Sequence, residues 1–190
     1  MATATVTREN FRPVSDLMMI CRKDFAVADP TLVNPLNAIA LTDGEWLSLN
    51  AVGKVQRATN ITVLGDVAKT ICFPMWAERG RTDVQALSAR KVPVFYMGQY
   101  EAETRIFDAT TVVGAGAAMT ALLQPVKVAT IQATVMGAGV RNFTGLVGAS
   151  YDDPDPIVGY ITALPANNGG KLRFIKGWAV QNGVAVTVTP

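Results

Sequence analysis

The chain has 190 residues, of which 49% are hydrophobic and 17% are charged, and its formal net charge is +2. This combination excludes a chain that is disordered throughout. So small a net charge gives no electrostatic indication of nucleic-acid binding. The sequence contains no histidine, so the commonest general base and metal ligand of proteins is missing. Composition therefore favours a β-rich globular protein that is not an enzyme.

Residues 1–16 are polar, contain Pro13 and show no hydrophobic period. They predict an extended N-terminal arm that precedes a single β domain at residues 17–190. The first residues lack the apolar stretch of a signal peptide, and no later segment reads as a membrane helix. We therefore expect no membrane partner and assembly in a cytoplasm.

Short apolar or alternating segments, separated by turn residues, follow the arm. An Asp-Gly pair at 43–44 predicts a hairpin turn, and Gly98 predicts a break within the longest of these segments. Alternation of Glu101, Glu103 and Arg105 with apolar residues is typical of a half-buried strand. The strands expected from this first half are residues 17–25, 39–41, 46–49, 69–75 and 92–107.

Residues 109–151 contain only two charges, Lys127 and Arg141. We expect a short helix at 115–123 and long strands at 126–135 and 140–149, with Thr130, Gln132 and Thr134 on one strand face. Because desolvating such a face costs less than desolvating charges, this segment favours contact with another protein.

The last forty residues again read as strands and turns. Asp152, Asp153 and Asp155 alternate with prolines and predict a stiff, solvated acidic turn, because the Gly and Glu of a calcium loop are absent. An Asn-Gly-rich turn at 165–170 predicts a hairpin between strands 157–164 and 171–180, and a last strand is expected at 184–188. Together the elements predict an all-β fold, sandwich-like or barrel-like, with at most one or two short helices.

No motif predicts a catalytic, cofactor-binding or metal site. The two Gly-Ala-Gly segments, at 114–116 and 137–139, lack the third glycine of a dinucleotide-binding loop. Glu101 and Glu103 share a strand face beside Arg105, which favours charge pairing over glycoside chemistry. The apolar neighbours of Cys21 and Cys72 predict two buried, reduced thiols.

Three regions are candidate interfaces. The loop at 76–81 concentrates Trp76, Arg79 and Arg81, residue types that are enriched in interface hot spots. The arm has no core of its own, so we expect it to become ordered on a partner. The third region is the uncharged strand face. The candidate interface residues are Arg8, Phe11, Arg12, Trp76, Arg79, Arg81, Thr130, Gln132 and Thr134.

Several segments taken together resemble small virion proteins of tailed bacteriophages, of the head decoration or cement kind. The resemblance spans roughly residues 17–178, and the charge-poor segment 109–151 matches least well. The segments that carry it are 22–25 (RKDF), 43–47 (DGEWL), 77–81 (AERGR), 83–86 (DVQA), 92–95 (VPVF), 98–108 (GQYEAETRIFD), 159–162 (GYIT) and 164–175 (LPANNGGKLRFI).

The resemblance implies a non-enzymatic β domain on the capsid surface, often trimeric, that bridges neighbouring major capsid subunits. Two alternatives remain at this point: a tail-tube or other minor virion protein, and a small carbohydrate- or host-binding β module. The second alternative needs an exposed aromatic platform, for which Trp46, Trp76 and Trp178 are the candidates, although their strand settings favour burial.

Overall fold

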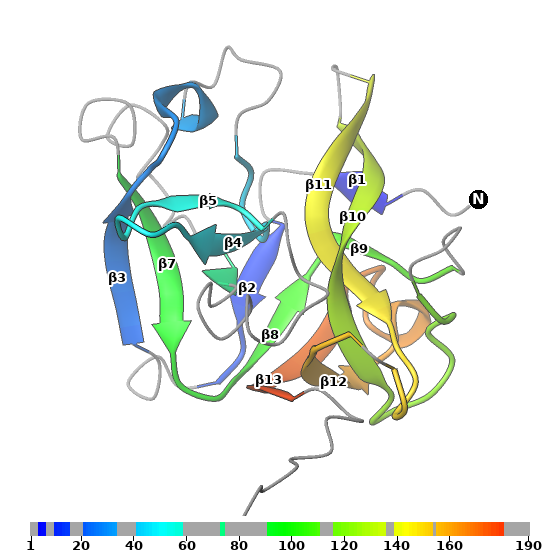
Figure 1. The fold of residues 1–190 in the computed structure, drawn as a ribbon. Coiled ribbons are helices and arrows are strands. Elements are labelled where there is room, and N and C mark those ends of the chain that lie inside the picture. The colour runs from blue at the N-terminus through cyan, green and yellow to red at the C-terminus, as the bar shows by residue number, and fades with distance from the viewer. Residues whose placement is uncertain are drawn as a thin grey trace, which may run out of the picture.

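The computed structural model describes residues 4–6, 10–15, 21–33, 41–58, 73–74, 91–110, 116–135, 139–153 and 155–180. These residues form strands joined by loops, together with two short 3-10 helices, η2 (Pro30–Val33) and η3 (Pro165–Asn167) (Figure 1). The all-β prediction is therefore confirmed. None of the helices in the described ranges has the length and apolar character that crossing a membrane requires.

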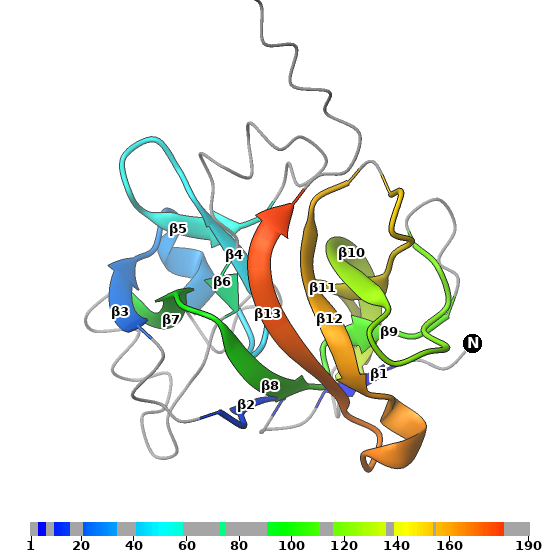
Figure 2. The ribbon, with the colours of Figure 1, turned by 90° about the horizontal axis from the view of Figure 1, so that it is seen from below.

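A large mixed sheet organises the molecule, in the order β2–β8–β13–β12–β10–β11–β9, with β1 paired to β10 (Figure 2). Neighbouring strands are antiparallel except in the pairs β1–β10 and β9–β11. The strands are β1 (Ala4–Val6), β2 (Phe11–Pro13), β8 (Tyr100–Thr104), β9 (Phe107–Asp108), β10 (Pro125–Val135), β11 (Gly139–Gly148), β12 (Ile157–Ala163) and β13 (Leu172–Val180).

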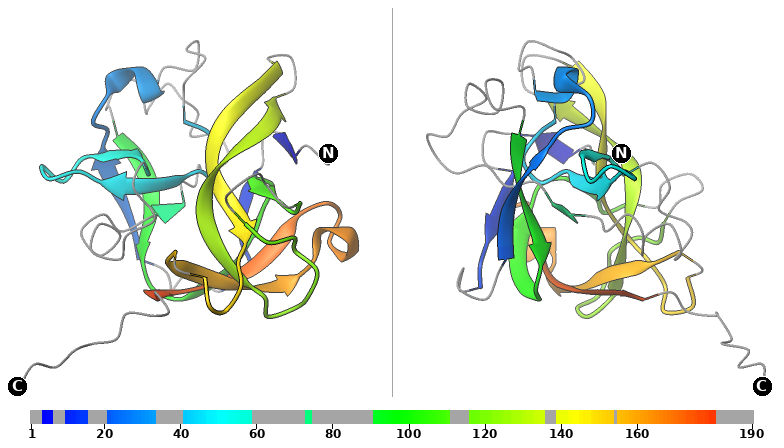
Figure 3. Two further views of the ribbon diagram at one scale, coloured as in Figure 1. Left: turned by 45° about the vertical axis from the view of Figure 1, so that its right-hand side comes forward. Right: turned by 60° about the vertical axis from the view of Figure 1, so that its left-hand side comes forward.

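Two smaller sheets lie on one side of the molecule, and the long β10–β11 hairpin lies on the other (Figure 3). One of the smaller sheets pairs β3 with β7, and the other small sheet has the strand order β5–β4–β6. Their strands are β3 (Cys21–Ala26), β4 (Trp46–Leu49), β5 (Val55–Arg57), β6 (Phe73–Pro74) and β7 (Lys91–Met97).

The main core lies between the large sheet and the smaller ones. Trp46 and Phe95 come from the small sheets and are each 1% exposed, and they pack in one cluster with Tyr100 and Phe174 of the large sheet. A second cluster joins the small sheets through Val27, Leu47, Val55, Val92 and Val94. Burial of Trp46 removes one of the three candidates for an exposed aromatic platform.

The turn expected at 43–44 forms, but it does not close a hairpin, because β4 pairs with β5 and β6. Gly44 has a φ of +89°, Gly98 has a φ of +97°, and both occupy turns where a side chain would be strained. The strands expected at 126–135, 140–149, 157–164 and 171–180 are confirmed to within one residue at each end. The strand expected at 184–188 lies outside the described residues.

The N-terminal segment differs from the extended arm that we expected. β1 pairs with residues 133–135 of β10, and β2 pairs with β8 inside the same chain. Phe11 is only 4% exposed, and its ring lies 5.8 Å from that of Phe95. Strands of three residues are too short to show a hydrophobic period, which is why the sequence pattern did not reveal them.

The prediction of a short helix at 115–123 is wrong for residues 116–123, the part that the structure describes. Ala117 forms a β-bridge with Gly148, Met119 enters the core, and residues 121–123 form a turn. The side chain of Gln124 replaces the missing helical hydrogen bonds, since its Oε1 accepts from the Thr120 amide at 2.9 Å and its Nε2 donates to the Ala118 carbonyl at 2.8 Å.

The predicted burial of Cys21 is also wrong. Its thiol is free but exposed, because β3 belongs to a two-stranded sheet and Cys21 stands at its first position. Cys72 lies outside the described residues, so the predicted state of that thiol stays a prediction.

Candidate interaction surfaces

The large sheet presents one face to the core and one to solvent. Along β8 and β13, side chains alternate: Tyr100, Ala102, Leu172 and Phe174 are at most 2% exposed and face inward. The intervening residues face outward. We define the outer face by its residues on β2, β8, β13 and β12 and in the segment after β2, namely Arg12, Val14, Glu101, Glu103, Tyr160, Thr162, Arg173 and Ile175.

An apolar band crosses this outer face from β2 to the start of β10. The Val14 amide donates to the Glu101 carbonyl at 2.8 Å, which places Val14 beside Glu101. Ile175 stands opposite Glu101 on one side and Tyr160 on the other. Tyr151 stacks on Tyr160 with ring centroids 6.5 Å apart. The band therefore contains Val14, Ile175, Tyr160, Tyr151 and Leu123.

Exposed apolar side chains are concentrated here. In the described part of the chain, seven large hydrophobic residues are exposed, and five of them belong to or adjoin this band. The five are Val14 (37% exposed), Ile175 (40%), Leu122 (60%), Leu123 (62%) and Tyr151 (62%). Single exposed apolar residues are ordinary, but a group on one sheet face is typical of an interaction site.

The loop before β10 holds Leu122 and Leu123 in place. Leu123 has a φ of +61°, a conformation that is unusual for a bulky side chain. Its amide donates to the Ile161 carbonyl at 2.7 Å, and its carbonyl accepts from the Tyr151 hydroxyl at 2.7 Å. These hydrogen bonds fix the backbone at Leu123, and the side chains of Leu122 and Leu123 are exposed to solvent.

A cationic cluster on the outer face spans β2, β8 and the start of β13. The carboxylate of Glu103, with only 3% of its side chain exposed, lies 2.6 Å from Arg173 Nη2, 3.0 Å from Arg12 Nη2 and 3.6 Å from Lys171 Nζ. Three cations surround one carboxylate, so the cluster as a whole is positive. Arg12 is the most accessible of them, with 63% of its side chain exposed.

The charge state of this cluster follows from its contacts. Burial acts to raise the pKa of Glu103, but hydrogen bonds from Arg173 and Asn168 and the positive charges of Arg12 and Arg173 outweigh it and lower the pKa. The same hydrogen bond raises the pKa of Arg173. Glu103 is paired as expected, although with these cations and not with the neighbouring Arg105. Glu101 accepts a hydrogen bond from the Thr162 hydroxyl at 2.6 Å.

The acidic turn at 152–156 is only partly solvated, which corrects the sequence prediction. Lys127, buried in β10, places its Nζ 3.0 Å from Asp153 and 2.7 Å from Asp155. A buried lysine requires acidic partners, and Asp153 is buried together with Lys127 in this ion pair. Asp152 stays exposed, and a hydrogen bond with the Ser150 side chain lowers its pKa.

A second surface lies toward the tip of the β10–β11 hairpin. Val126 and Val128 are buried on one face of β10, whereas Thr130 and Gln132 on the same face are exposed. Asn142 stands opposite Gln132 and is exposed, and Val140 is 61% exposed. We call Thr130, Gln132, Val140 and Asn142 the hairpin face. None of these four side chains is charged, and the neighbouring Arg141 lies on the opposite face of β11.

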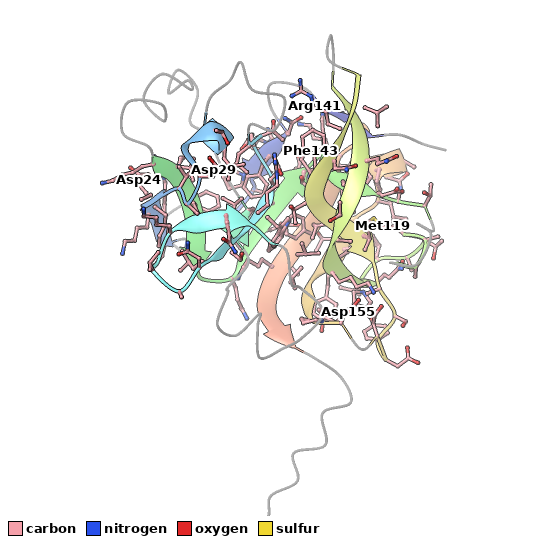
Figure 4. All side chains as sticks on the ribbon, turned by 45° about the horizontal axis from the view of Figure 1, so that its top comes forward. Asp24, Asp29, Met119, Arg141, Phe143 and Asp155 are labelled. Carbon is pink, nitrogen blue, oxygen red and sulfur yellow. The ribbon has the colours of Figure 1, made fainter. Side chains whose placement is uncertain are left out.

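The two surfaces are separated along the hairpin. Arg141 lies toward the tip, and Asp155 lies near the opposite end (Figure 4). Phe143, a buried residue of β11, lies between Arg141 and Asp155 along the hairpin (Figure 4).

The predicted interface residues have three outcomes. Thr130 and Gln132 share an exposed face as expected, whereas Thr134 pairs with Val140 but its side chain is not described. Arg12 is exposed within the cationic cluster, and Phe11 lies in the core of its own chain. The remaining candidates, Arg8, Trp76, Arg79 and Arg81, lie outside the described residues.

The sequence analysis missed the apolar band. The adjacent Leu122 and Leu123 in an uncharged segment were its clearest signal, but the expected helix concealed that they are exposed. Val14 and Ile175 are 161 positions apart in the sequence, and only the pairing of β2, β8 and β13 brings them to one face.

The other buried carboxylate in the described ranges is also neutralised. Glu45 is fully buried and accepts hydrogen bonds from Arg57 Nε at 2.7 Å and from the Thr42 amide at 2.8 Å. Within these ranges, no three His, Cys, Asp or Glu side chains gather in a way that would hold a metal ion. Comparison with protein-family models, with curated proteins and with solved structures returned no match.

Proposed function

We propose that this protein is a non-enzymatic structural component of a phage virion, a decoration protein that binds the major capsid lattice and stabilises the head. The observation that carries the proposal is the uncharged, exposed hairpin face at the end of a rigid, fully paired β10–β11 ladder. A water-facing strand usually carries Lys or Glu, which prevent wrong pairing, and this face carries neither.

The chemistry of the hairpin face suits a protein partner. Thr130, Gln132 and Asn142 offer hydroxyl and amide groups that can donate and accept hydrogen bonds, and Val140 adds apolar area. Burying such neutral groups costs less than burying charges. Ten register pairs fix the hairpin, so little conformational freedom is lost on binding.

The resemblance to decoration proteins gives separate support. Its two longest segments, 98–108 and 164–175, contribute β8 and the first four residues of β13, which are neighbours in the large sheet. Segments distant in the sequence thus form one surface. In the part of the chain that the structure describes, the three buried carboxylates are Glu45, Glu103 and Asp153, and each is engaged by a cation. This structural use agrees with a non-catalytic role.

The proposed mechanism is stabilisation by mass action. A protein that binds only the expanded shell favours that shell in proportion to its occupancy, and weak contacts add up over many lattice sites. No chemical step is required. The hairpin face contacts the capsid, and the outer face stays available for another partner.

The test is co-sedimentation of the purified chain with expanded heads of the phage that encodes it, with unexpanded proheads in a parallel sample. We expect binding to expanded heads and at least a tenfold loss for Val140→Asp, because the substitution places a charge in the contact. The matched control is Val52→Asp, which changes an exposed valine (75% exposed) in a turn of the small sheet. Equal binding of both variants, or no binding by the wild type, contradicts the proposal.

A further inference from the structure

Positive charge is concentrated on one part of the outer face. The strand register places Arg12, Glu103 and Arg173 side by side on β2, β8 and β13. Glu103 Oε1 is engaged by Arg173, and Oε2 faces both Arg12 Nη2 and Lys171 Nζ. One nearly buried negative charge is therefore shared by three positive charges.

Arg105 adds a fourth cation to this group. It follows β8 between two buried residues, so its side chain leaves the sheet on the same side as that of Glu103. A Cβ placed on Gly170 would lie 3.6 Å from Arg105 Nη1, so the guanidinium reaches the turn that precedes Lys171. In the part of the chain that the structure describes, no carboxylate forms an ion pair with Arg105.

We call these four cations and Glu103 the cationic block. Four positive charges and one negative charge give it a net charge of +3, whereas the whole chain has a net charge of only +2. Glu101, the next outward residue of β8, lowers the local value to +2. Arg12 has 63% of its side chain exposed, so the block is accessible from solvent. Its positive charges repel one another, and a bound anion would relieve that repulsion.

An apolar row lies directly beside the cationic block. Val14 stands two positions after Arg12, Ile175 stands two positions after Arg173, and Tyr160 is opposite Ile175. Positions two apart on a strand are separated by about 7 Å. Along β13, the outer face therefore presents cations at 171 and 173 and an apolar side chain at 175.

We propose that the outer face binds an acidic, extended segment of a partner protein, which lies along β13 with two carboxylates over the cationic block and an apolar side chain against Ile175. An extended segment has the same two-residue repeat as β13, so its alternate side chains match positions 171, 173 and 175. Arginine suits this use, because its planar guanidinium binds carboxylates in a fixed geometry.

The surroundings of the block favour a polypeptide over a nucleic acid or a free anion. A nucleic-acid backbone carries a charge at every repeat, and Glu101 would repel that backbone where the cationic block ends. Val14 and Ile175 are 37% and 40% exposed. Apolar side chains contribute nothing to holding an inorganic anion, but they stabilise a segment that buries an apolar residue against them.

This binding is separate from the proposed contact between the hairpin face and the capsid. It uses no residue of the hairpin face, and its test needs only the purified chain and a synthetic peptide. Failure to bind phage heads would leave it standing, and failure to bind the peptide would leave head binding standing.

The first experiment tests the match of charges. A labelled peptide, Thr-Glu-Thr-Glu-Thr-Leu-Thr, is titrated with the full chain at low salt, and binding is followed by fluorescence anisotropy. We expect saturable binding that weakens as salt is added, and at least about tenfold weaker binding of the peptide with glutamine in place of both glutamates. Absence of saturable binding, or equal binding of the two peptides, overturns the proposal.

Variants of the chain locate the binding. Arg12→Gln combined with Arg105→Gln should weaken binding of the acidic peptide by about tenfold, because two cations of the block are lost. The matched control, Lys23→Gln combined with Lys54→Gln, removes the same charge from exposed positions of β3 and of a turn, and should bind almost as the wild type does. Circular dichroism checks that both variants are folded. Equal weakening by the two variants contradicts binding at the block.

A double-mutant cycle tests the alignment along β13. Ile175→Ser in the chain and serine in place of leucine in the peptide should each weaken binding, and together they should weaken it no more than either change alone. Additive losses would show that the two apolar side chains do not meet, which overturns the alignment.

Competition distinguishes the acidic segment from other anions. Inorganic phosphate and a single-stranded oligothymidylate are added to the complex of the chain with the labelled peptide. We expect neither to displace the peptide at a concentration at which unlabelled peptide does. Displacement by either one at that concentration would show a general anion site and would overturn the proposal.

Discussion

Lys127 and Asp153 form a buried ion pair that joins β10 to the turn before β12, with Nζ 3.0 Å from the carboxylate and 8% and 11% of the two side chains exposed. The second carboxylate, Asp155, lies 2.7 Å from the same Nζ. Hydrogen bonds to both acids and their negative charges overcome the effect of burial and raise the pKa of Lys127. One of the two charges in the charge-poor segment thus serves the fold and is withheld from the surface.

Lys127→Met should destabilise the fold strongly. Removing the ammonium leaves Asp153 buried without its cation, and breaking a buried pair from one side typically costs about 3 kcal/mol or more. Chemical denaturation should show this loss, and Lys54→Met, an exposed change in a turn, should stay within about 0.5 kcal/mol of the wild type. A small loss for Lys127→Met would show that the pair lies in water.

Glu103 should make the fold sensitive to acid. Because its pKa is lowered in the folded state, the folded chain binds fewer protons than the unfolded chain near the ordinary carboxyl pKa of 4.5. The stabilisation is therefore present above that pH and is lost as the pH falls through the folded pKa.

Glu103→Gln tests this dependence. The variant should be less stable than the wild type at pH 7, because Arg12, Lys171 and Arg173 lose their shared carboxylate. Its free energy of unfolding should also fall less between pH 5 and about pH 3. Denaturation at several pH values measures both effects, and parallel pH profiles for the two proteins would exclude Glu103 as a source of acid sensitivity.

Tyr100→Phe should leave the fold as stable as the wild type or stabilise it by up to about 1 kcal/mol. The Tyr100 hydroxyl is buried and has no hydrogen-bond partner among the described residues, and burial raises its pKa well above 10. Removing an unpaired buried hydroxyl removes a desolvation cost and keeps the ring contacts with Phe11 and Phe95. Thermal unfolding measures the change, and a clear loss of stability would show that the hydroxyl is hydrogen-bonded.

Gly145→Ala should destabilise the β10–β11 hairpin by about 2 kcal/mol or more. A Cβ at this position would lie 2.5 Å from Ile131 Cδ1 and 2.7 Å from the Ile106 carbonyl oxygen, so the backbone would have to move. Gly177→Ala is the matched control, since no atom lies within 4 Å of a Cβ built there. If both variants unfold at the same denaturant concentration, the close packing around Gly145 is disproved.

Local chemistry was sufficient to predict much of the fold. Alternation along 126–135 and the glycines at 169 and 170, both with positive φ, specify strands and turns without reference to distant residues. The ion pair of Lys127 could not be predicted, because Asp153 is 26 positions away and its proximity depends on the sheet. For the same reason, the apolar band emerges only when four strands are aligned.

The N-terminal segment shows a second limit of sequence reasoning. Phe11 has polar neighbours on both sides, and a three-residue strand cannot reveal which face it buries. Its place in the core depends on Phe95 and Tyr100, which belong to strands far along the chain. Short strands of this kind are defined by their partners and carry little signal of their own.

The most direct test of the proposed function is quantitative mass spectrometry of virions whose heads and tails have been separated, from the phage that encodes the chain. The account predicts that the protein is found with the heads in many copies per particle, in a fixed ratio to the major capsid protein. Its absence from heads would contradict the account, and recovery with the tails would favour a tail-tube or minor virion role.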